Sequence, residues 1–238
     1  MRIPRNRQLA KGDIVHTTWR GHNKEWIFKS PADKLAYLDM IDEAAEEYDF
    51  ELYAYAVMGT HDHNMGEAET VEGYSSFFQE VHGRYAQRYN RQHDRSGAVG
   101  SGRPKSIVIK DERHFLNAMF YSDANPVRAG VVRHPRHYPW SSHNFYAHGT
   151  RGPGTRALQP PVWYLNLGKT PRARQRAYRR QCDAYLRHMG LLPAPGRSPA
   201  FYADRAAEGE RVEVGRDRPA VSLEGTVVQV PDLAGDTS

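Results

Sequence analysis

The stretch that decides the fold reads Tyr53-Ala54-Tyr55-Ala56-Val57-Met58-Gly59-Thr60-His61-Asp62-His63. Its first half alternates aromatic and small apolar residues, which predicts a β-strand. Gly59-Thr60 is a turn signal, and we expect a second strand to begin at the histidines that follow. Because successive side chains of a strand point to opposite faces, His61 and His63 then share one face and Asp62 points to the other.

The histidine pair has two interpretations. Two neutral imidazoles on one face can bind a divalent metal ion. The pair can also be a hydrogen-bonded loop pair, since 12 histidines in 238 residues make a chance His-x-His motif common. The motif alone leaves both interpretations open.

A second motif lies about sixty residues further on and reads Tyr121-Ser122-Asp123-Ala124-Asn125-Pro126-Val127-Arg128-Ala129-Gly130. Apolar residues at helical spacing predict a helix over about 112–124, which Pro126 should end or kink. Tyr121 and Asn125 are four residues apart, so a helix offers the phenol and the amide oxygen on one face. The alternative is a core tyrosine beside a capping asparagine.

The remaining elements complete a recognisable order. Ser30 and Pro31 predict a helix start, with Asp33 closing a capping box, and the acidic residues of that helix predict a solvated face. The other predicted segments are strands over 14–19, 50–58 and 107–109, and helices over 73–90 and 171–189. The order β, α, β, β, α, β, α favours an α+β fold of the ferredoxin-like or RRM-like type, an antiparallel sheet with helices packed on one face. The residues of the expected acidic face are Asp42, Glu43, Glu46 and Glu47.

Taken in order, these motifs resemble the single-tyrosine HUH transposases, in particular their REP-associated tyrosine transposase branch. The resemblance covers roughly residues 10–146. It implies the same fold, with the histidine pair on a central strand and the tyrosine helix packed across it. The segments that carry it are His61-x-His63, Tyr121-x-x-x-Asn125-Pro126-Val127-Arg128-Ala129-Gly130, and the stretches 15–21, 83–90, 102–106 and 138–142.

Chemical reasoning assigns roles to four of these residues. Tyr121 can act as a nucleophile on a phosphodiester, and a Mg²⁺ or Mn²⁺ ion on His61 and His63 would polarise the phosphate. Asn125, one turn beyond Tyr121, can supply the oxygen ligand that such hard ions prefer, and the resemblance supports that role. The expected activity is a metal-dependent endonuclease and strand transferase with a 5′-phosphotyrosine intermediate. The resemblance implies single-stranded or hairpin DNA as the substrate.

Basic side chains at helical spacing and in one loop predict contacts with DNA phosphates. A charged outer helix face is the alternative interpretation for each helical group. Arg128 belongs to the tyrosine motif itself. The full set of expected DNA-binding residues is Arg84, Arg88, Arg91, Arg103, Lys105, Ser106, Arg128, Arg176, Arg179 and Arg180.

Asp62 is a departure from the family, which usually has an apolar residue between the histidines. A buried carboxylate costs several kcal/mol unless it is paired or hydrogen-bonded. We therefore expect an arginine or lysine beside Asp62, an exposed strand face, or a frayed strand. A catalytically retired nucleic-acid-binding protein of the same fold is the alternative function. A zinc protein built on the pair is weaker, since no further Cys or His has suitable spacing.

Composition sets the outer limits. The 238 residues carry a net charge of +5, and the pI of about 9.3 permits a polyanionic partner. Cys182 is the one cysteine, which excludes an intrachain disulfide. Neither a signal peptide nor a membrane-length apolar run is evident, so we expect a cytoplasmic protein, monomeric or homodimeric, that binds no membrane. The expected organisation is a nuclease domain over 1–148, a linker over 149–161, a basic helical extension over 162–190 and a partly mobile tail over 191–238.

Overall fold

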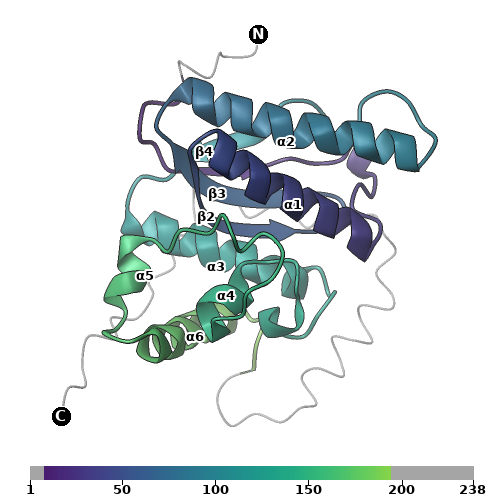
Figure 1. Ribbon diagram of the computed structural model, residues 1–238. Coiled ribbons are helices and arrows are strands. Elements are labelled where there is room, and N and C mark those ends of the chain that lie inside the picture. The colour runs from purple at the N-terminus through teal and green to yellow at the C-terminus, as the bar shows by residue number, and fades with distance from the viewer. Residues whose placement is uncertain (1–7, 194–238) are drawn as a thin grey trace, which may run out of the picture.

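A four-stranded antiparallel sheet forms the centre of the molecule (Figure 1). The computed structural model describes residues 8–193. The element order confirms the predicted β, α, β, β, α, β, α succession of the ferredoxin-like type. The strands are β1 (Val15–Thr18), β2 (Phe50–Val57), β3 (Asp62–Ala68) and β4 (Lys105–Val108).

The strand order β2-β3-β1-β4 puts the histidine strand β3 in the middle of the sheet. β2 and β3 form a hairpin in which Val57 lies opposite Asp62, and a register shift between Leu52 and Ala54 interrupts it. β3 also pairs with β1, where Thr17 lies opposite Asn64. The sheet therefore brings the first strand of the chain directly beside the His-Asp-His motif.

Helices α1 (Pro31–Glu47) and α2 (Val71–Gln92) cover one face of the sheet. The start of α1 confirms the predicted capping box, since the side chain of Ser30 accepts from the Asp33 N–H and the Asp33 carboxylate accepts from the Ser30 N–H. Aromatic side chains from α2 fill the space between helix and sheet, and the rings of Phe50 and Phe77 stack at 4.0 Å. This layer is a sealed and largely apolar core.

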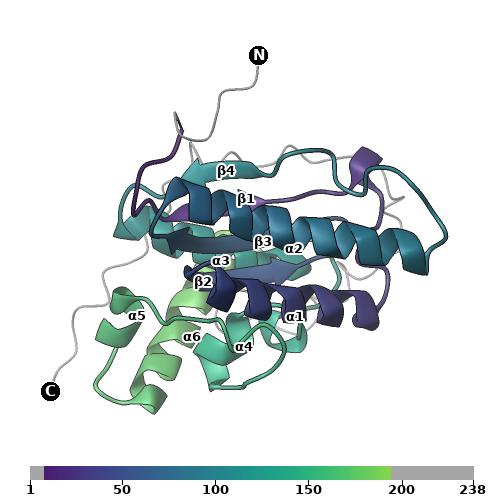
Figure 2. The same cartoon turned by 45° about the horizontal axis from the view of Figure 1, so that its top comes forward.

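The opposite face of the sheet is also covered by helices, which corrects the expectation that all helices pack on one face (Figure 2). The tyrosine helix α3 (Glu112–Arg128) packs there against β2, with α6 (Pro171–His188) behind it. β3 can support two cores because its alternate side chains point to opposite layers. The elements after β4 are α3 (Glu112–Arg128), α4 (His143–His148), α5 (Val162–Asn166) and α6 (Pro171–His188); the short 3₁₀ turns are η2 (His22–Lys24) and η3 (Pro135–His137).

Helix α3 runs past Pro126, where the sequence predicted an end or a kink near 124. Proline removes one N–H and so weakens a helix most in its interior. Pro126 stands in the last turn, where the loss is limited to one bond, and the Ala129 N–H still closes on the Asn125 carbonyl. Gly130 follows with φ of +71°, a conformation that glycine adopts without strain.

The segment 149–161 is held against α1 by a carboxylate. Asp42 accepts hydrogen bonds from the N–H groups of Gly154, at 3.1 Å, and Ala157, at 2.7 Å. Asp42 is 7% exposed, so its expected place on the solvated face of α1 was wrong. Asp42 is buried because the connecting segment 149–161 folds back over that part of α1, a tertiary contact that the helix pattern does not predict.

Within residues 8–193, no helix has the length and apolar content that crossing a membrane requires. The basic helix expected over 171–189 is confirmed as α6, which packs against α3, α4 and α5. Residues 1–7 of the expected first domain and 194–238 of the expected tail lie outside the described residues. The four-part division of the chain stays a prediction.

Candidate active site

Three histidines from β1 and the start of β3 gather on the sheet face that α3 covers. The His63 ring stacks on the His16 ring with centroids 5.1 Å apart and planes 1° apart. His61, which forms an isolated bridge with Arg20, has its ring centroid 5.0 Å from that of His63. The predicted common face of His61 and His63 is therefore confirmed, and β1 adds a third imidazole.

Hydrogen bonds hold the His63 ring through one nitrogen only. His63 Nδ1 lies 3.0 Å from His16 Nε2 and 3.2 Å from Thr18 Oγ1. His63 Nε2 is buried and has no hydrogen-bond partner among the described residues. His61 is held in the same manner, with Nδ1 2.9 Å from Thr60 Oγ1. Each ring of the pair thus keeps Nε2 available for another partner.

Burial makes all three imidazoles poor bases. It is the largest cause that lowers the pKa of His16 and of His61 to about 4 in each case, and the charge of Arg20 contributes to the lowering at His61. Burial, followed by the neighbouring His61, lowers the pKa of His63 well below its usual value. The rings are therefore neutral near pH 7, which is the form that binds a metal ion.

Tyr121 projects from α3 toward these histidines. Its ring centroid lies 5.7 Å from that of His63 and 6.4 Å from that of His16, in edge-on orientations. The Arg128 guanidinium carbon lies 4.9 Å from the centroid of the Tyr121 ring. The Asn125 amide nitrogen donates to the Tyr121 carbonyl at 3.0 Å, so the amide oxygen is the atom that remains for a cation. Tyr121 is half-buried and borders the histidine cluster.

Asp62 points to the opposite, α1–α2 face and is fully buried. It accepts the Trp19 N–H at 2.8 Å, the Asn64 amide at 2.9 Å and the Tyr37 hydroxyl. His82 Nε2 lies 3.7 Å from the same carboxylate. The expected arginine or lysine partner, exposed face and frayed strand are all wrong, because donors from β3, α1 and the residue that follows β1 satisfy the carboxylate.

Cationic side chains surround the histidine cluster. Lys105 lies opposite Thr18 in the β1–β4 ladder, and directly opposed residues share a face. Its charge lowers the pKa of His16, as that of Arg128 lowers the pKa of His63. Together with Arg20, these residues give the site a positive environment that suits a phosphate group.

Sequence reasoning missed three residues of this cluster, His16, Thr18 and Arg20. The signal was available as polar residues at every second position of a predicted strand, which places them on one face. The spacing of these polar residues does not say which strand β1 pairs with, and the structure pairs it with β3 rather than β2. The pairing of β1 with β3 is a long-range contact.

Several predicted DNA-binding residues lie away from Tyr121. Arg84 on α2 pairs with Glu43 of α1 at 2.8 Å and with Glu80 at 3.7 Å, on the far side of the sheet. Arg88 bonds to Gln92 on the same helix, and Arg91 is exposed there. These three residues are not brought together with the histidine cluster, and their role stays a prediction.

The other basic groups have mixed surroundings. Ser106 Oγ bonds to the Tyr74 hydroxyl at 2.8 Å, so it faces α2, whereas Lys105 beside it faces the site. Arg103 is exposed in the turn before β4. On α6, Arg179 donates to the Ala147 carbonyl and anchors the helix to α4, while Arg176 and Arg180 are exposed.

Comparison with known proteins gives a family match and a likeness to a solved structure. Residues 11–101 match the model of the IS200-like transposases, a span that includes the three histidines and stops short of Tyr121. The structure of a REP-associated tyrosine transposase bound to a REP hairpin is similar with a TM-score of 0.48 and 19% identity. That likeness covers 64% of this chain and 94% of the other. No curated protein matches.

Proposed function

We propose that the chain is a metal-dependent single-stranded DNA endonuclease and strand transferase acting on hairpin-containing DNA, as the match of residues 11–101 to the model of the IS200-like transposases suggests. The observation that carries the proposal is the meeting of Tyr121 and His63. Their ring centroids are 5.7 Å apart, and His63 Nε2 is buried without a partner among the described residues. A nucleophile and a candidate metal ligand thus meet on one chain.

Tyr121 is proposed to attack a DNA phosphate. The bond from Tyr121 Oη to phosphorus forms as the bond from phosphorus to the 3′ oxygen breaks, which gives a 5′-phosphotyrosine link and a free 3′-hydroxyl. The phenolic proton leaves to solvent, which a half-buried side chain can reach, and the leaving 3′ oxygen takes up a proton from solvent. Arg128, 4.9 Å above the ring, stabilises the negative charge that develops on the phenol oxygen. Attack by the 3′-hydroxyl on the link reverses the step and rejoins a strand.

His61 and His63, with the Asn125 amide oxygen, are the residues that would hold Mg²⁺ or Mn²⁺. The bound ion would act as a Lewis acid on the scissile phosphate. The fit rests on neutral rings with Nε2 available. His16 supports it as a positioning residue: when His63 Nδ1–H donates to His16 Nε2, the lone pair of His63 stays on Nε2. The opposite tautomer would put a proton on that atom.

DNA affinity is proposed to come first from the cations beside the site. Arg20, Lys105 and Arg128 surround the histidines, and such charges bind phosphates regardless of sequence. Exposed Arg103, Arg176 and Arg180 extend the set as proposed outer contacts. A paired stem would be read by shape, and its single-stranded flank would reach Tyr121.

The test is covalent capture. A labelled pool of DNA hairpins with randomised single-stranded flanks is sorted for binding to the full chain and then incubated with Mn²⁺. We expect a denaturation-resistant protein–DNA adduct that Tyr121→Phe abolishes. Tyr48→Phe is the matched control, since Tyr48 is also half-buried but ends α1 on the other side of the sheet.

Two results would count against the proposal in different ways. Hairpins that bind but never form an adduct would favour the retired, binding-only protein. An adduct that survives Tyr121→Phe would move the nucleophile to another residue.

A further inference from the structure

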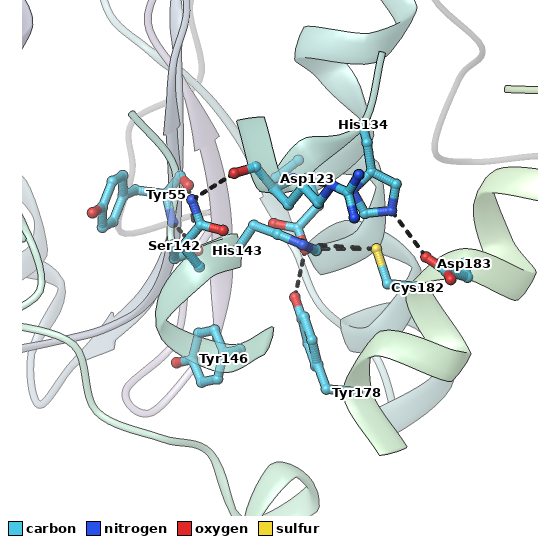
Figure 3. A network of polar contacts seen from close by, with 12 residues as sticks. Tyr55, Asp123, His134, Ser142, His143, Tyr146, Tyr178, Cys182 and Asp183 are labelled. Atoms are coloured by element: carbon cyan, nitrogen blue, oxygen red, sulfur yellow. Dashed lines mark hydrogen bonds and ion pairs between the residues drawn. The ribbon is translucent and has the colours of Figure 1, made fainter. Parts of the chain in front are cut away.

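A second cluster of metal-binding side chain types lies behind the tyrosine helix (Figure 3). Asp123 comes from α3, His143 from α4 and Cys182 from α6, and their side chains point toward one another. All three are almost completely buried. Asp123 is two residues from Tyr121 in the helix, so it faces away from the active site and toward the C-terminal helix.

The spacing of the three atoms suits a small metal ion. Asp123 Oδ2 lies 2.8 Å from His143 Nδ1, and Cys182 Sγ lies 3.9 Å from each of these atoms. A point equidistant from three atoms at these separations is about 2.1 Å from each, close to the usual zinc–nitrogen and zinc–oxygen lengths and slightly short of zinc–sulfur. Small side-chain shifts would therefore be enough to seat an ion.

Hydrogen bonding alone does not satisfy the cluster. The Tyr178 hydroxyl donates to Asp123 Oδ2 at 2.6 Å, which concentrates the bonds on one carboxylate oxygen. Asp123 Oδ1 and His143 Nε2 are buried and have no hydrogen-bond partner among the described residues. A buried carboxylate oxygen without a donor costs free energy. Coordination by both oxygens would use Asp123 Oδ1 and complete four donors.

From this geometry we propose that Asp123, His143 and Cys182 bind a structural zinc ion. Sulfur beside nitrogen and oxygen suits zinc, whereas the histidine pair at the active site has no sulfur donor. Without a cation, burial and the charge of Asp123 raise the pKa of the Cys182 thiol well above its usual value. Zinc would hold it as thiolate.

The ion would join three segments that are far apart in the sequence. It would fix the back of α3 to α4 and α6, where the Phe120 ring already lies 5.4 Å from the Tyr178 ring. Because Tyr121 and Asn125 flank Asp123 on α3, this crosslink would set how firmly the tyrosine helix sits over the histidines. The proposed zinc site does not depend on whether Tyr121 attacks DNA.

Cobalt spectroscopy tests this site without measuring activity. The full chain is refolded in chelator-treated buffer with one equivalent of Co²⁺, since a buried site loads most readily during folding. Cys182 is the only cysteine of the chain, so a thiolate-to-Co²⁺ charge-transfer band can arise only here. We expect the band in the natural chain and in a His61→Ala/His63→Ala variant, its loss in Cys182→Ser, and its displacement by Zn²⁺.

A thermal unfolding series keeps the proposal falsifiable if Cys182→Ser folds poorly. Zn²⁺ present during refolding should raise the Tm of the natural chain and of His61→Ala/His63→Ala, and Asp123→Asn should remove most of that rise. Absence of both the charge-transfer band and the Zn²⁺-dependent rise in the natural chain would overturn the site. The three side chains would then be a buried hydrogen-bonded group only.

Discussion

The two faces of β3 carry buried polar residues that differ in whether their hydrogen-bonding atoms have partners. Toward α1 and α2, Asp62 is sealed and bonded to Trp19, Asn64 and Tyr37. Toward α3, His63 keeps a buried nitrogen without a partner among the described residues, close to Tyr121. The difference separates a polar group that is satisfied within the fold from one that we propose binds a metal ion. It also shows that the side chain of the aspartate between the histidines lies in another layer of the structure, away from their rings.

The largest expected effect is on the rate of adduct formation, and it follows from removing a proposed metal ligand on the α3 face of the sheet. His63→Ala should lower the rate of adduct formation at least about 100-fold with little change in hairpin binding, because a metal ligand is lost while the surrounding cations remain. Adduct yield and hairpin affinity are measured on the same preparation. His22→Ala, at an exposed histidine, is the control. Parallel loss of binding would mean that His63 supports the DNA surface rather than the chemistry.

The next effect should appear on the sealed face and in stability. Asp62→Ala leaves three buried donors without their acceptor, so we expect the free energy of unfolding to fall by about 3 kcal/mol. Urea denaturation measures it, with Asp39→Ala on the exposed side of α1 as the control. His61→Ala should cost much less. If Asp62→Ala kept full stability and lost cleavage instead, the division between the two faces would fail.

Acidification should act through the neutral histidines. Burial holds the pKa of His16 at about 4, against 6.5 for an ordinary histidine. Below pH 6.5 the unfolded chain takes up a proton that the folded chain refuses, so stability falls as the pH falls. At about pH 5 one such residue lowers the free energy of unfolding by about 2 kcal/mol relative to neutral pH.

A variant identifies the residue responsible. In His16→Gln, the difference in unfolding free energy between about pH 7.5 and about pH 5 should be smaller by about 2 kcal/mol, the amount attributed to this histidine. An unchanged pH dependence would show that His16 is not buried and neutral in solution. The same variant should also slow cleavage, because a glutamine amide at this position cannot set the tautomer of His63 in the same manner.

The smallest effect concerns DNA affinity on the two sides of the sheet. Arg128→Ala should weaken hairpin binding about tenfold. It should also reduce the slope of log affinity against log salt concentration by about one. Arg84→Ala should do less, since Arg84 already pairs with Glu43 and Glu80 across from the site. Equal losses would indicate that DNA also contacts the α2 face, as the sequence pattern had suggested.

The sequence by itself determined the order of elements, the capped start of α1, the common face of His61 and His63 and the shared helix of Tyr121 and Asn125. These follow from periodicity and capping, which depend on residues a few positions apart. The predicted helix end near residue 124 was wrong, because Pro126 lies in the last turn of α3 and the helix continues to Arg128. The roles of Tyr121, Asn125 and the expected DNA contacts remain predictions.

Only the tertiary structure decided which of these side chains meet. Strand pairing brought His16 to His63 and the Trp19 N–H to Asp62. Helix docking brought the Tyr37 hydroxyl to Asp62 and joined Asp123 to Cys182 across 59 positions. Such contacts depend on strand register and on the direction in which a helix packs, and neither is encoded in local spacing. For that reason the sequence predicted the candidate ligands His61, His63 and Asn125, which lie in two short motifs, but not the cluster of Asp123, His143 and Cys182.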